Sequence, residues 1–475
     1  MATRTLPLDS ADAAAPTPVG ATVARLRRGF ADGRTRDLRH RQAQLRALDL
    51  MLAEQERAIL DALRQDLGKG EGESLSSELI FVRGEIRHAL KHLRRWAAPE
   101  RVRTPVHLQP ARSRIRREPL GVVLVIGAWN LPIPVLLGPA IAALAAGNAV
   151  VLKPSELAAA TSALIAREVP RYLDRDTVAV VEGGAEVTAT LLEQDIDKIF
   201  FTGGERVGRI VAEAAGQRVI PVTLELGGKS PAILLPDADL EVSARRLAWA
   251  KWMNAGQVCV APDYVLAPEA KVDELVAALT RSLARFYGAD PAASPDYARI
   301  VNDAHYDRLV ATLAGSGGRV VHGGGADRTT RYIAPTIVVA PNLGSRLMRE
   351  EIFGPILPIV PVRDAEEAVA FVNARPRPLV VHAFGRDRRA LDRIERTTSS
   401  GAFLVNDATI SHSVPDLPFG GVGASGYGSY HGRAGFDTFS HARAIFRRST
   451  LFDSALRYPP YTPARIRLVR RMLGL

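Results

Sequence analysis

The segment 121-GVVLVIGAWNLPIPVLLGPAIAALAAGNAVVLKPS-155 sets the architecture expected for this chain. Its first nine residues form a continuous apolar run, which is typical of a strand covered on both faces. A helix-like apolar segment follows and stops at Gly147 and Asn148, and a second apolar strand occupies 149–155. Because parallel strands need a crossover connection, the segment predicts two parallel strands joined by a helix.

The same alternation continues along the chain. Further strands are expected at 177–183, 198–204 and 222–228, with one helix before each. A second set of strands and helices starts near Pro231 and indicates another α/β domain. We therefore expect an α/β fold with a wound parallel sheet and a second α/β domain.

The flanking segments have other patterns. Apolar residues at three- and four-residue spacing between 23 and 67 predict long amphipathic helices; 70-GEGE-73 interrupts them, and a further helix runs to about Trp96. Two prolines make 100–119 extended or hairpin-like. The Gly-rich, aromatic stretch 417–439 is expected to be loop and extended structure.

Composition limits the classes of function. The chain has 475 residues, 47% hydrophobic, and a single cysteine, Cys259, which excludes an internal disulfide and fits the cytoplasm. Residues 1–20 show neither periodicity nor a signal-peptide pattern, so we expect them to be disordered. No apolar run approaches the roughly 20 residues of a membrane-spanning helix.

The net charge of +11 raises the question of an anionic partner. Its surplus is mostly arginine spread along helical segments without interleaved aromatic residues, which favours solvated faces over nucleic-acid binding. The tail 464–475 places Arg467, Arg470 and Arg471 on one side of a helix. Such a tail either packs on its own protein, which we favour, or lies on an anionic membrane surface.

One strand-to-helix turn is a candidate phosphate site. In 198-KIFFTGGERVGRIV-211 a strand runs into Gly203 and opens a helix that contains Gly208, which brings backbone N–H groups and the positive helix end toward a pyrophosphate. Lys153 and Glu156 lie at another strand end, where they could hold ribose hydroxyl groups. Glycines at such turns are commonly structural, so the spacing alone is a weak signal.

Three residues together suggest nucleophilic chemistry on a carbonyl. Cys259, alone in 252-WMNAGQVCVAPDY-264, could be a core filler or a nucleophile. A nucleophilic thiol needs a pKa below about 8.5, which a helix end or a cation can produce. Glu225 could activate water, or be a paired surface acid, and Asn130 could donate to an oxyanion, or cap a helix.

Seven blocks identify a family resemblance between about residues 21 and 460. They are, in order, PLGVVLVIGAWN, VLKPSE, FTGGERVG, PVTLELGGKSP, NAGQVCVAPDYV, EEIFGPILP and LPFGGVGASGYGSYHGRAGFDTFSH. In this order the chain resembles the NAD(P)-dependent aldehyde dehydrogenases, most closely their class 3 branch. One departure is Leu131, where the family usually has an aromatic residue, so we expect a reshaped aldehyde entrance.

The resemblance implies a role for each candidate residue. Cys259 would be the nucleophile, Glu225 the general base and Asn130 the oxyanion donor. The residues implied in cofactor binding are Lys153 and Glu156 at the adenosine ribose, Gly203 and Gly208 at the pyrophosphate, Glu351 at the nicotinamide ribose and Phe353 near the ring. Glu156 should disfavour a 2′-phosphate and Lys153 should favour one, so we expect NAD with some use of NADP.

The resemblance also implies the domain organisation and the assembly. The expected NAD(P)-binding domain comprises 21–99 and 120–226, the catalytic domain 227–404, the bridging and oligomerisation element 100–119 and 405–445, and the tail 446–475. The bridging strands imply a homodimer. The expected reaction is oxidation of medium- or long-chain aliphatic or aromatic aldehydes to acids through a cysteine thiohemiacetal and thioester.

Two alternatives remain at this stage. A coenzyme A-acylating aldehyde dehydrogenase would release the acyl group to a thiol, although such an enzyme has no need of Glu225. A catalytically silent scaffold would keep the fold without the chemistry. The identity of the aldehyde does not follow from the sequence.

Overall fold

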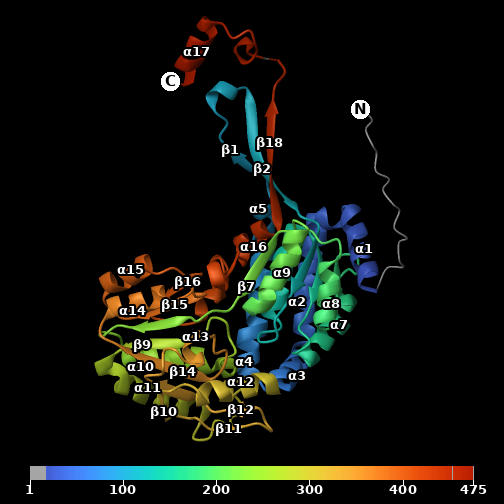
Figure 1. Cartoon of the computed structure of the whole chain (residues 1–475). Helices are drawn as coiled ribbons and strands as arrows, with labels where there is room; N and C mark the ends of the chain where they lie inside the picture. Colours follow the sequence, from blue (N-terminus) through green and yellow to red (C-terminus); the bar gives the residue numbers. More distant parts are fainter. Residues whose placement is uncertain (1–17, 452, 474–475) are drawn as a thin grey trace, which may run out of the picture.

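The computed structural model describes residues 18–451 and 453–473, which form two α/β lobes and a projecting β arm (Figure 1). The predicted start of the chain, 1–20, lies mostly outside the described residues. Where the description begins, Pro18 already opens helix α1 (Pro18–Ala31), so the expectation of disorder is wrong for 18–20.

The first lobe contains the predicted wound parallel sheet. The strand order is β17-β7-β6-β3-β4-β5, and only β17 runs antiparallel. The strands are β3 (Val122–Ile126), β4 (Ala149–Lys153), β5 (Val178–Val180), β6 (Lys198–Gly203), β7 (Val222–Leu226) and β17 (Gly426–Tyr427). The five parallel strands all fall in segments predicted to be strands.

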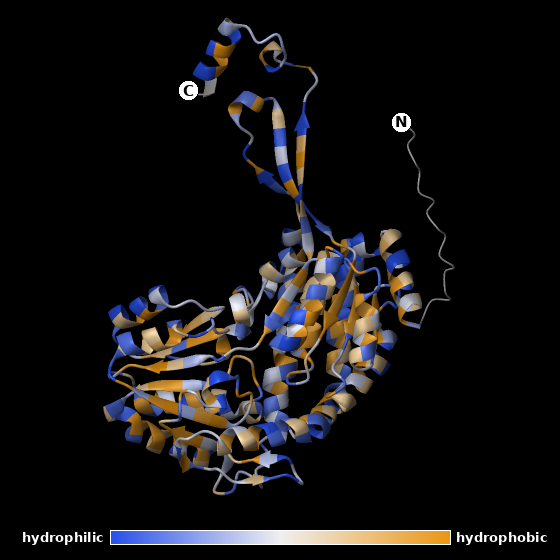
Figure 2. Ribbon diagram, in the orientation of Figure 1, coloured by the Kyte–Doolittle hydropathy of each residue, from blue (hydrophilic) through white to orange (hydrophobic). Residues whose placement is uncertain are grey.

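Both faces of this sheet are covered, which explains its continuous apolar runs. Val123 and Val125 of β3 pack into one hydrophobic cluster, while Val122 and Leu124 pack into another on the opposite face. The first cluster includes α2 (Leu38–Glu54), α3 (Glu56–Leu67), α5 (Phe81–Ala97), α6 (Pro134–Ala146) and α7 (Ala159–Tyr172), and the second α1, α8 (Ala185–Leu192) and α9 (Glu205–Gln217). Figure 2 shows the strands as hydrophobic and the outer helices as mixed.

The second lobe repeats the arrangement with seven strands in the order β10-β13-β14-β9-β8-β15-β16. They are β8 (Pro231–Leu234), β9 (Tyr264–Pro268), β10 (Arg319–His322), β13 (Thr336–Val339), β14 (Ile356–Val362), β15 (Val380–Phe384) and β16 (Ala402–Val405), and only β10 is antiparallel. Its longer helices are α10 (Leu240–Trp252), α11 (Val272–Tyr287), α12 (Asp303–Ala314), α14 (Ala365–Asn373) and α15 (Arg388–Thr397).

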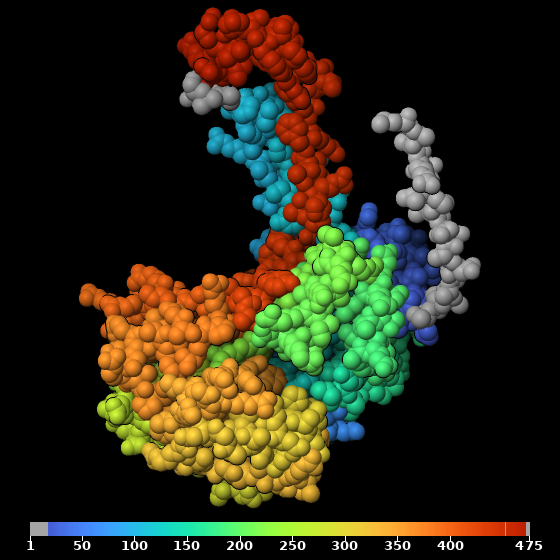
Figure 3. Space-filling view, in the orientation of Figure 1, coloured from blue at the N-terminus to red at the C-terminus, as the bar shows by residue number. Residues whose placement is uncertain are grey.

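The arm is a three-stranded antiparallel sheet that stands clear of both lobes (Figure 3). It contains β1 (Glu100–Val102), β2 (Ala111–Pro119) and β18 (Ser440–Arg448), and β2 pairs with β18 over nine residues. The extended structure predicted for 100–119 is confirmed. Of the segment 405–445, only the part from Ser440 onward joins the arm, because 426–427 pairs with β7 and a short helix precedes β18.

Three local expectations are corrected. The Gly-rich stretch contains a helix, α16 (Gly432–Thr438), which packs on α6 and places buried Phe436 beside Trp96 of α5. The break at GEGE lies earlier than expected, since α4 (Glu71–Ser74) begins inside it and runs through a π-helical turn, Leu75–Ile80, into α5. The tail helix α17 (Pro463–Leu473) lies beyond the arm and exposes Ile466 and Leu468 rather than packing them on the lobes (Figure 1).

Candidate active site

A cavity of about 510 Å³ lies at the carboxyl ends of the first sheet's strands and is closed by loops of the second lobe. It brings together six of the nine predicted site residues: Asn130, Gly203, Glu225, Cys259, Glu351 and Phe353. The other three, Lys153, Glu156 and Gly208, lie outside its lining. Residues from distant parts of the sequence therefore meet in one site.

The loop before Cys259 has an unusual backbone. After α10, Asn254 and Ala255 both have φ of 51° and Gly256 has φ of 75°, all in the left-handed region. A side chain at Gly256 would place its Cβ 2.2 Å from the carbonyl oxygen of Gly354, so this position requires glycine. Backbone strain of this kind persists only where the surroundings hold it and is frequent at functional sites.

Gln257 holds this loop in place. Its side-chain amide donates to the carbonyl oxygens of Asn254, at 2.9 Å, and Arg299, at 3.0 Å. Its Oε1 accepts a hydrogen bond from the N–H of Val301 at 3.0 Å. The residues around the cysteine in the sequence therefore serve to fix the position of its backbone.

Among the described residues, no cation lowers the pKa of the Cys259 thiol. Burial and then the negative charges of Glu351 and Glu225 raise the pKa of the thiol to about 12, whereas the backbone N–H groups of Cys259 and Val260 oppose the rise. The pKa of the thiol therefore lies above the range that nucleophilic attack requires. A thiolate here requires either a nearby proton acceptor or a positive charge brought by a ligand.

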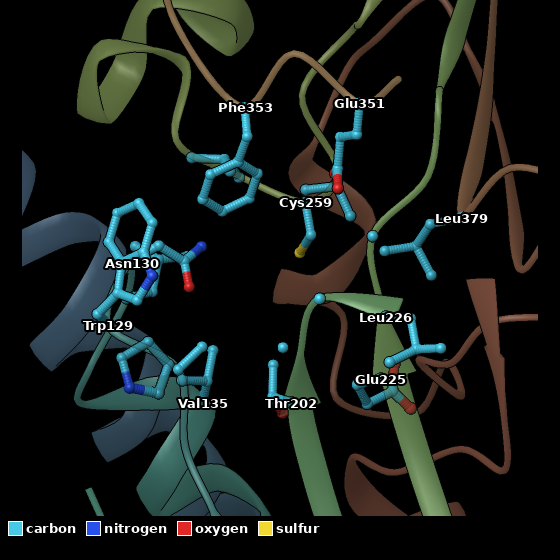
Figure 4. Close-up of a pocket in the computed structure, with 18 of the residues that line it drawn as sticks. Trp129, Asn130, Val135, Thr202, Glu225, Leu226, Cys259, Glu351, Phe353 and Leu379 are labelled. Atoms are coloured by element: carbon cyan, nitrogen blue, oxygen red, sulfur yellow. The ribbon is translucent and has the colours of Figure 1, made fainter. Parts of the chain in front are cut away.

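Glu225 is such a proton acceptor. It lies on β7, its carboxyl group is buried, and neither carboxylate oxygen has a hydrogen-bond partner among the described residues. Burial raises the pKa of this carboxyl group well above its usual value. A carboxyl group in this state can take up and release a proton near neutral pH. Figure 4 shows it on a strand end below Cys259, beside Thr202 of β6.

Asn130 faces the thiol from the other side of the cavity (Figure 4). One N–H of its side-chain amide donates to the carbonyl oxygen of Gln257 at 3.1 Å. The second N–H of the same group has no protein acceptor in the described structure and is available to a ligand. Asn130 precedes α6 by several residues and makes no cap hydrogen bond, so the helix-cap interpretation is wrong.

Glu351 and Phe353 come from the segment between α13 (Arg346–Arg349) and β14. Lys229 donates to the carbonyl oxygens of Leu347 and Glu350, at 2.7 and 3.0 Å, which anchors this segment. Burial first, and then Asp263, raise the pKa of Glu351 to about 8. Phe353 adopts φ of 48° and meets the ring of Trp129 edge-on at 5.3 Å, forming one wall of the cavity.

The three residues outside the cavity have distinct environments. Lys153 is buried at the end of β4 and donates to Glu156, which is half-exposed, at 3.0 Å. β4 and β6 flank β3, so Lys153 and Gly203 lie at the same carboxyl edge of the sheet, where an extended dinucleotide can reach both. Gly208 is buried in α9, where a Cβ would lie 2.6 Å from Leu226; it permits close packing and does not reach the cavity.

The start of α9 fits a phosphate group. Its N-cap, Gly204, provides no side-chain hydrogen bond to the helix, and no atom lies within 4 Å of the Cβ position there. Gly204, Glu205 and Arg206 line the cavity, so the first turn of the helix borders it and its N–H groups can donate to an anion there. In the described ranges, no group of three or more His, Cys, Asp or Glu residues is placed to hold a metal ion.

One end of the cavity is aromatic, and none of its residues was among the site residues predicted from the sequence. Aromatic side chains from three separate segments line it: Phe81, Phe419, Tyr430, His412 and His431. His431 stacks on Phe419 with ring centroids 5.4 Å apart, and its buried ring nitrogens make no hydrogen bond. The aromatic pair within the glycine-rich stretch, 430-YH-431, was the available signal. Leu131 also lines the cavity, at the position where an aromatic residue was expected.

Comparison with known proteins gives a consistent result. The model of the aldehyde dehydrogenase family matches residues 5–445. The chain is 47% identical to human aldehyde dehydrogenase family 3 member B1 over 95% of this chain and 97% of that one, and 45% identical to the dog protein "Aldehyde dehydrogenase, dimeric NADP-preferring" over 93% and 98%. A solved structure of Staphylococcus aureus AldH in a substrate-bound state superposes with a TM-score of 0.94, at 40% identity, over 96% and 100% of the two chains.

Proposed function

The chain belongs to the aldehyde dehydrogenase family and oxidises aldehydes to carboxylic acids with NAD(P)+, and on that premise we propose the roles of its own residues. Cys259 attacks the carbonyl carbon of the aldehyde. The free N–H of Asn130 and the backbone N–H of Cys259 donate to the oxyanion that forms. A bound nicotinamide supplies the acceptor for the hydride that leaves when the thiohemiacetal becomes a thioester.

Glu225 acts on protons in both halves of the reaction. Its unpartnered carboxylate takes the proton of the thiol and releases it to solvent, and after hydride transfer the carboxylate takes a proton from the water that hydrolyses the thioester. The observation that supports this proposal best is the convergence in one cavity of a lone thiol, a free amide N–H and a buried carboxylate without partners. This carboxylate also argues against a coenzyme A-acylating enzyme, which needs no water-activating base.

We propose Lys153, Glu156, Gly203, Glu351 and Phe353 as the cofactor contacts, with Gly208 shaping the turn through packing. NAD is the proposed preferred cofactor, with some use of NADP, because the half-exposed Glu156 carboxylate repels a 2′-phosphate. The dog relative's name describes an NADP-preferring enzyme, so the preference needs a direct comparison of the two cofactors.

The aromatic end of the cavity supports apolar substrates. Phe81, Phe419 and Tyr430 present ring faces and edges to a chain that enters from that side. We propose medium- and long-chain aliphatic and aromatic aldehydes as the substrate class. A series of aldehydes from short aliphatic to aromatic should show kcat/KM rising with apolar size.

We further propose the domain division and assembly given by the family resemblance, with the protein acting in the cytoplasm as a homodimer. The dog relative is named as a dimeric enzyme, and the arm projects β18 with one edge unpaired in the single chain. Within the two described ranges, every helix is too short or too polar to cross a bilayer. The exposed Arg470, Arg471 and Leu468 of α17 also suit contact with an anionic membrane surface, which a vesicle flotation assay would test.

Replacement of the cysteine tests the proposal directly. Cys259→Ala should abolish aldehyde-dependent NADH formation while NAD binding, measured by fluorescence titration, stays near the wild-type value. Normal turnover in this variant would refute the role of Cys259, and a wild-type protein without any turnover would indicate a silent scaffold. Release of free acid without coenzyme A separates hydrolysis from acylation.

A further inference from the structure

A buried ion pair lies behind the cavity, outside the proposed chemistry. Lys69, just before α4, and Glu78, in the π-helical turn Leu75–Ile80, form an ion pair in which both side chains are fully buried. Neither residue lines the cavity. A buried ion pair often contributes little net stability, because removing two charges from water is costly. Stability alone is therefore a weak explanation for this pair.

The pair holds both ends of the turn that carries Asn130. Lys69 Nζ donates to the backbone carbonyl oxygen of Asn130 at 3.3 Å. One carboxylate oxygen of Glu78 accepts a hydrogen bond from Lys69 Nζ, and the other accepts one from the backbone N–H of Ile133 at 3.0 Å. The residues between 130 and 133 are thus fixed by charged hydrogen bonds at each end, which are about twice as strong as neutral ones.

The same turn is tied to the loop of the nucleophile. Asn254 Nδ2 donates to the Asn130 carbonyl oxygen at 2.7 Å and to the Gln257 carbonyl oxygen at 3.1 Å. The Asn130 side chain donates to that same Gln257 oxygen at 3.1 Å. Lys69 and Asn254 therefore share one acceptor, and its orientation sets where the remaining N–H of Asn130 points.

We propose that Lys69 and Glu78 are positioning residues that orient the Asn130 amide toward the developing oxyanion. They act through the Asn130 backbone and do not touch the substrate. The inference rests on the proposed role of Asn130. A donor that is misdirected loses its stabilisation of the transition state and leaves binding of the uncharged aldehyde largely intact.

A double-mutant cycle tests this coupling. The double variant Lys69→Met/Glu78→Gln removes both charges together. If the double variant does not fold, Glu78→Gln alone serves as the test, because it retains the shape of the side chain. Both variants should lower kcat, the double variant by about 10-fold or more, and both should change the KM for the aldehyde by less than about 3-fold. The expected loss is smaller than the roughly 10²–10³-fold loss in kcat that follows removal of an oxyanion donor, because the donor is misdirected and not removed. In an Asn130→Ala background the same changes should lower kcat less than about 2-fold further.

Lys198→Met provides a matched control. Lys198 is also a buried lysine, bonded at 2.7 Å to the Thr223 hydroxyl group, and it does not line the cavity. This variant should leave kcat unchanged, because Lys198 contacts neither Asn130 nor the segment 130–133. Equal losses of kcat from the Lys69 and Glu78 changes in both backgrounds would overturn the positioning role and leave the proposed function intact. An unchanged kcat in Asn130→Ala alone would instead overturn the oxyanion role, and the positioning role with it.

Discussion

Replacing Glu225 by glutamine should separate the two halves of the reaction. The substitution keeps the size of the side chain and breaks no hydrogen bond, because neither carboxylate oxygen has a partner in the described structure. What it removes is the proton acceptor. Without that acceptor the thioester should form but should not be hydrolysed at a normal rate.

The size of the effect follows from the missing base. General-base catalysis contributes roughly 10²–10⁴-fold, so steady-state kcat should fall by that factor, which corresponds to about 3–5 kcal/mol in the barrier to hydrolysis. Because the chain has one cysteine, the burst of NADH before the steady state should approach one equivalent per chain. Because Glu225 also takes the proton of the thiol, the burst should be slower than in the wild type.

Stopped-flow absorbance of NADH measures both the burst and the steady rate, and intact-mass spectrometry detects the acyl group on Cys259. Glu85→Gln is a suitable control, because Glu85 is buried with a pKa raised by burial to about 7 and does not line the cavity. Its turnover should stay near the wild-type value. A steady-state rate within about 3-fold of wild type in Glu225→Gln would refute the role of Glu225 as base.

Three further results are expected. Burial, and then Asp263, raise the pKa of Glu351 from 4.5 to about 8. The free energy of unfolding of the wild type should therefore fall by up to about 5 kcal/mol relative to Glu351→Gln as the pH rises through that interval. A difference in unfolding free energy between the two proteins, measured with urea, that is the same at pH 5 and pH 8 would contradict this. Gly208→Ala should destabilise the protein by about 1–3 kcal/mol, because the added Cβ would contact Leu226. Gly216→Ala in the same helix should leave the melting temperature unchanged or raise it, because no neighbouring atom lies within 4 Å of the Cβ position there. Glu156→Gln should raise kcat/KM for NADP relative to NAD by about five-fold, and an unchanged ratio would remove Glu156 from the cofactor preference.

Local patterns in the sequence were sufficient to predict the parallel strands of the first sheet. An apolar run such as 122–126 indicates a strand that is covered on both faces. A helix between two such runs predicts that the two strands are parallel neighbours joined by a crossover connection. The helix α16 was missed because its residues include glycines and carry little helical signal. Its packing on α6 and the contact of buried Phe436 with Trp96 of α5 compensate for the weak propensity.

The candidate site residues could be identified by residue type and family order, since the chemistry of a lone thiol, an acid and an amide is written in the side chains. The hydrogen-bond partners and the pKa values of these residues could not be identified in this way. Asn130 and Gln257 are 127 positions apart and share a hydrogen bond only because the two lobes pack together. Burial and two carboxylates outweigh the backbone N–H groups and raise the pKa of Cys259, opposite to the lowering that nucleophilic attack requires.

Residue identities thus specified which groups can react and which segments form strands, because both properties are local. Packing of distant segments specified the depth of burial, the missing partners of Glu225 and the contacts of Lys69 and Glu78 behind Asn130. The reason is physical: the free energy of a charge or a hydrogen bond depends on the dielectric and on the donors around it, and these are supplied by residues far away in the chain.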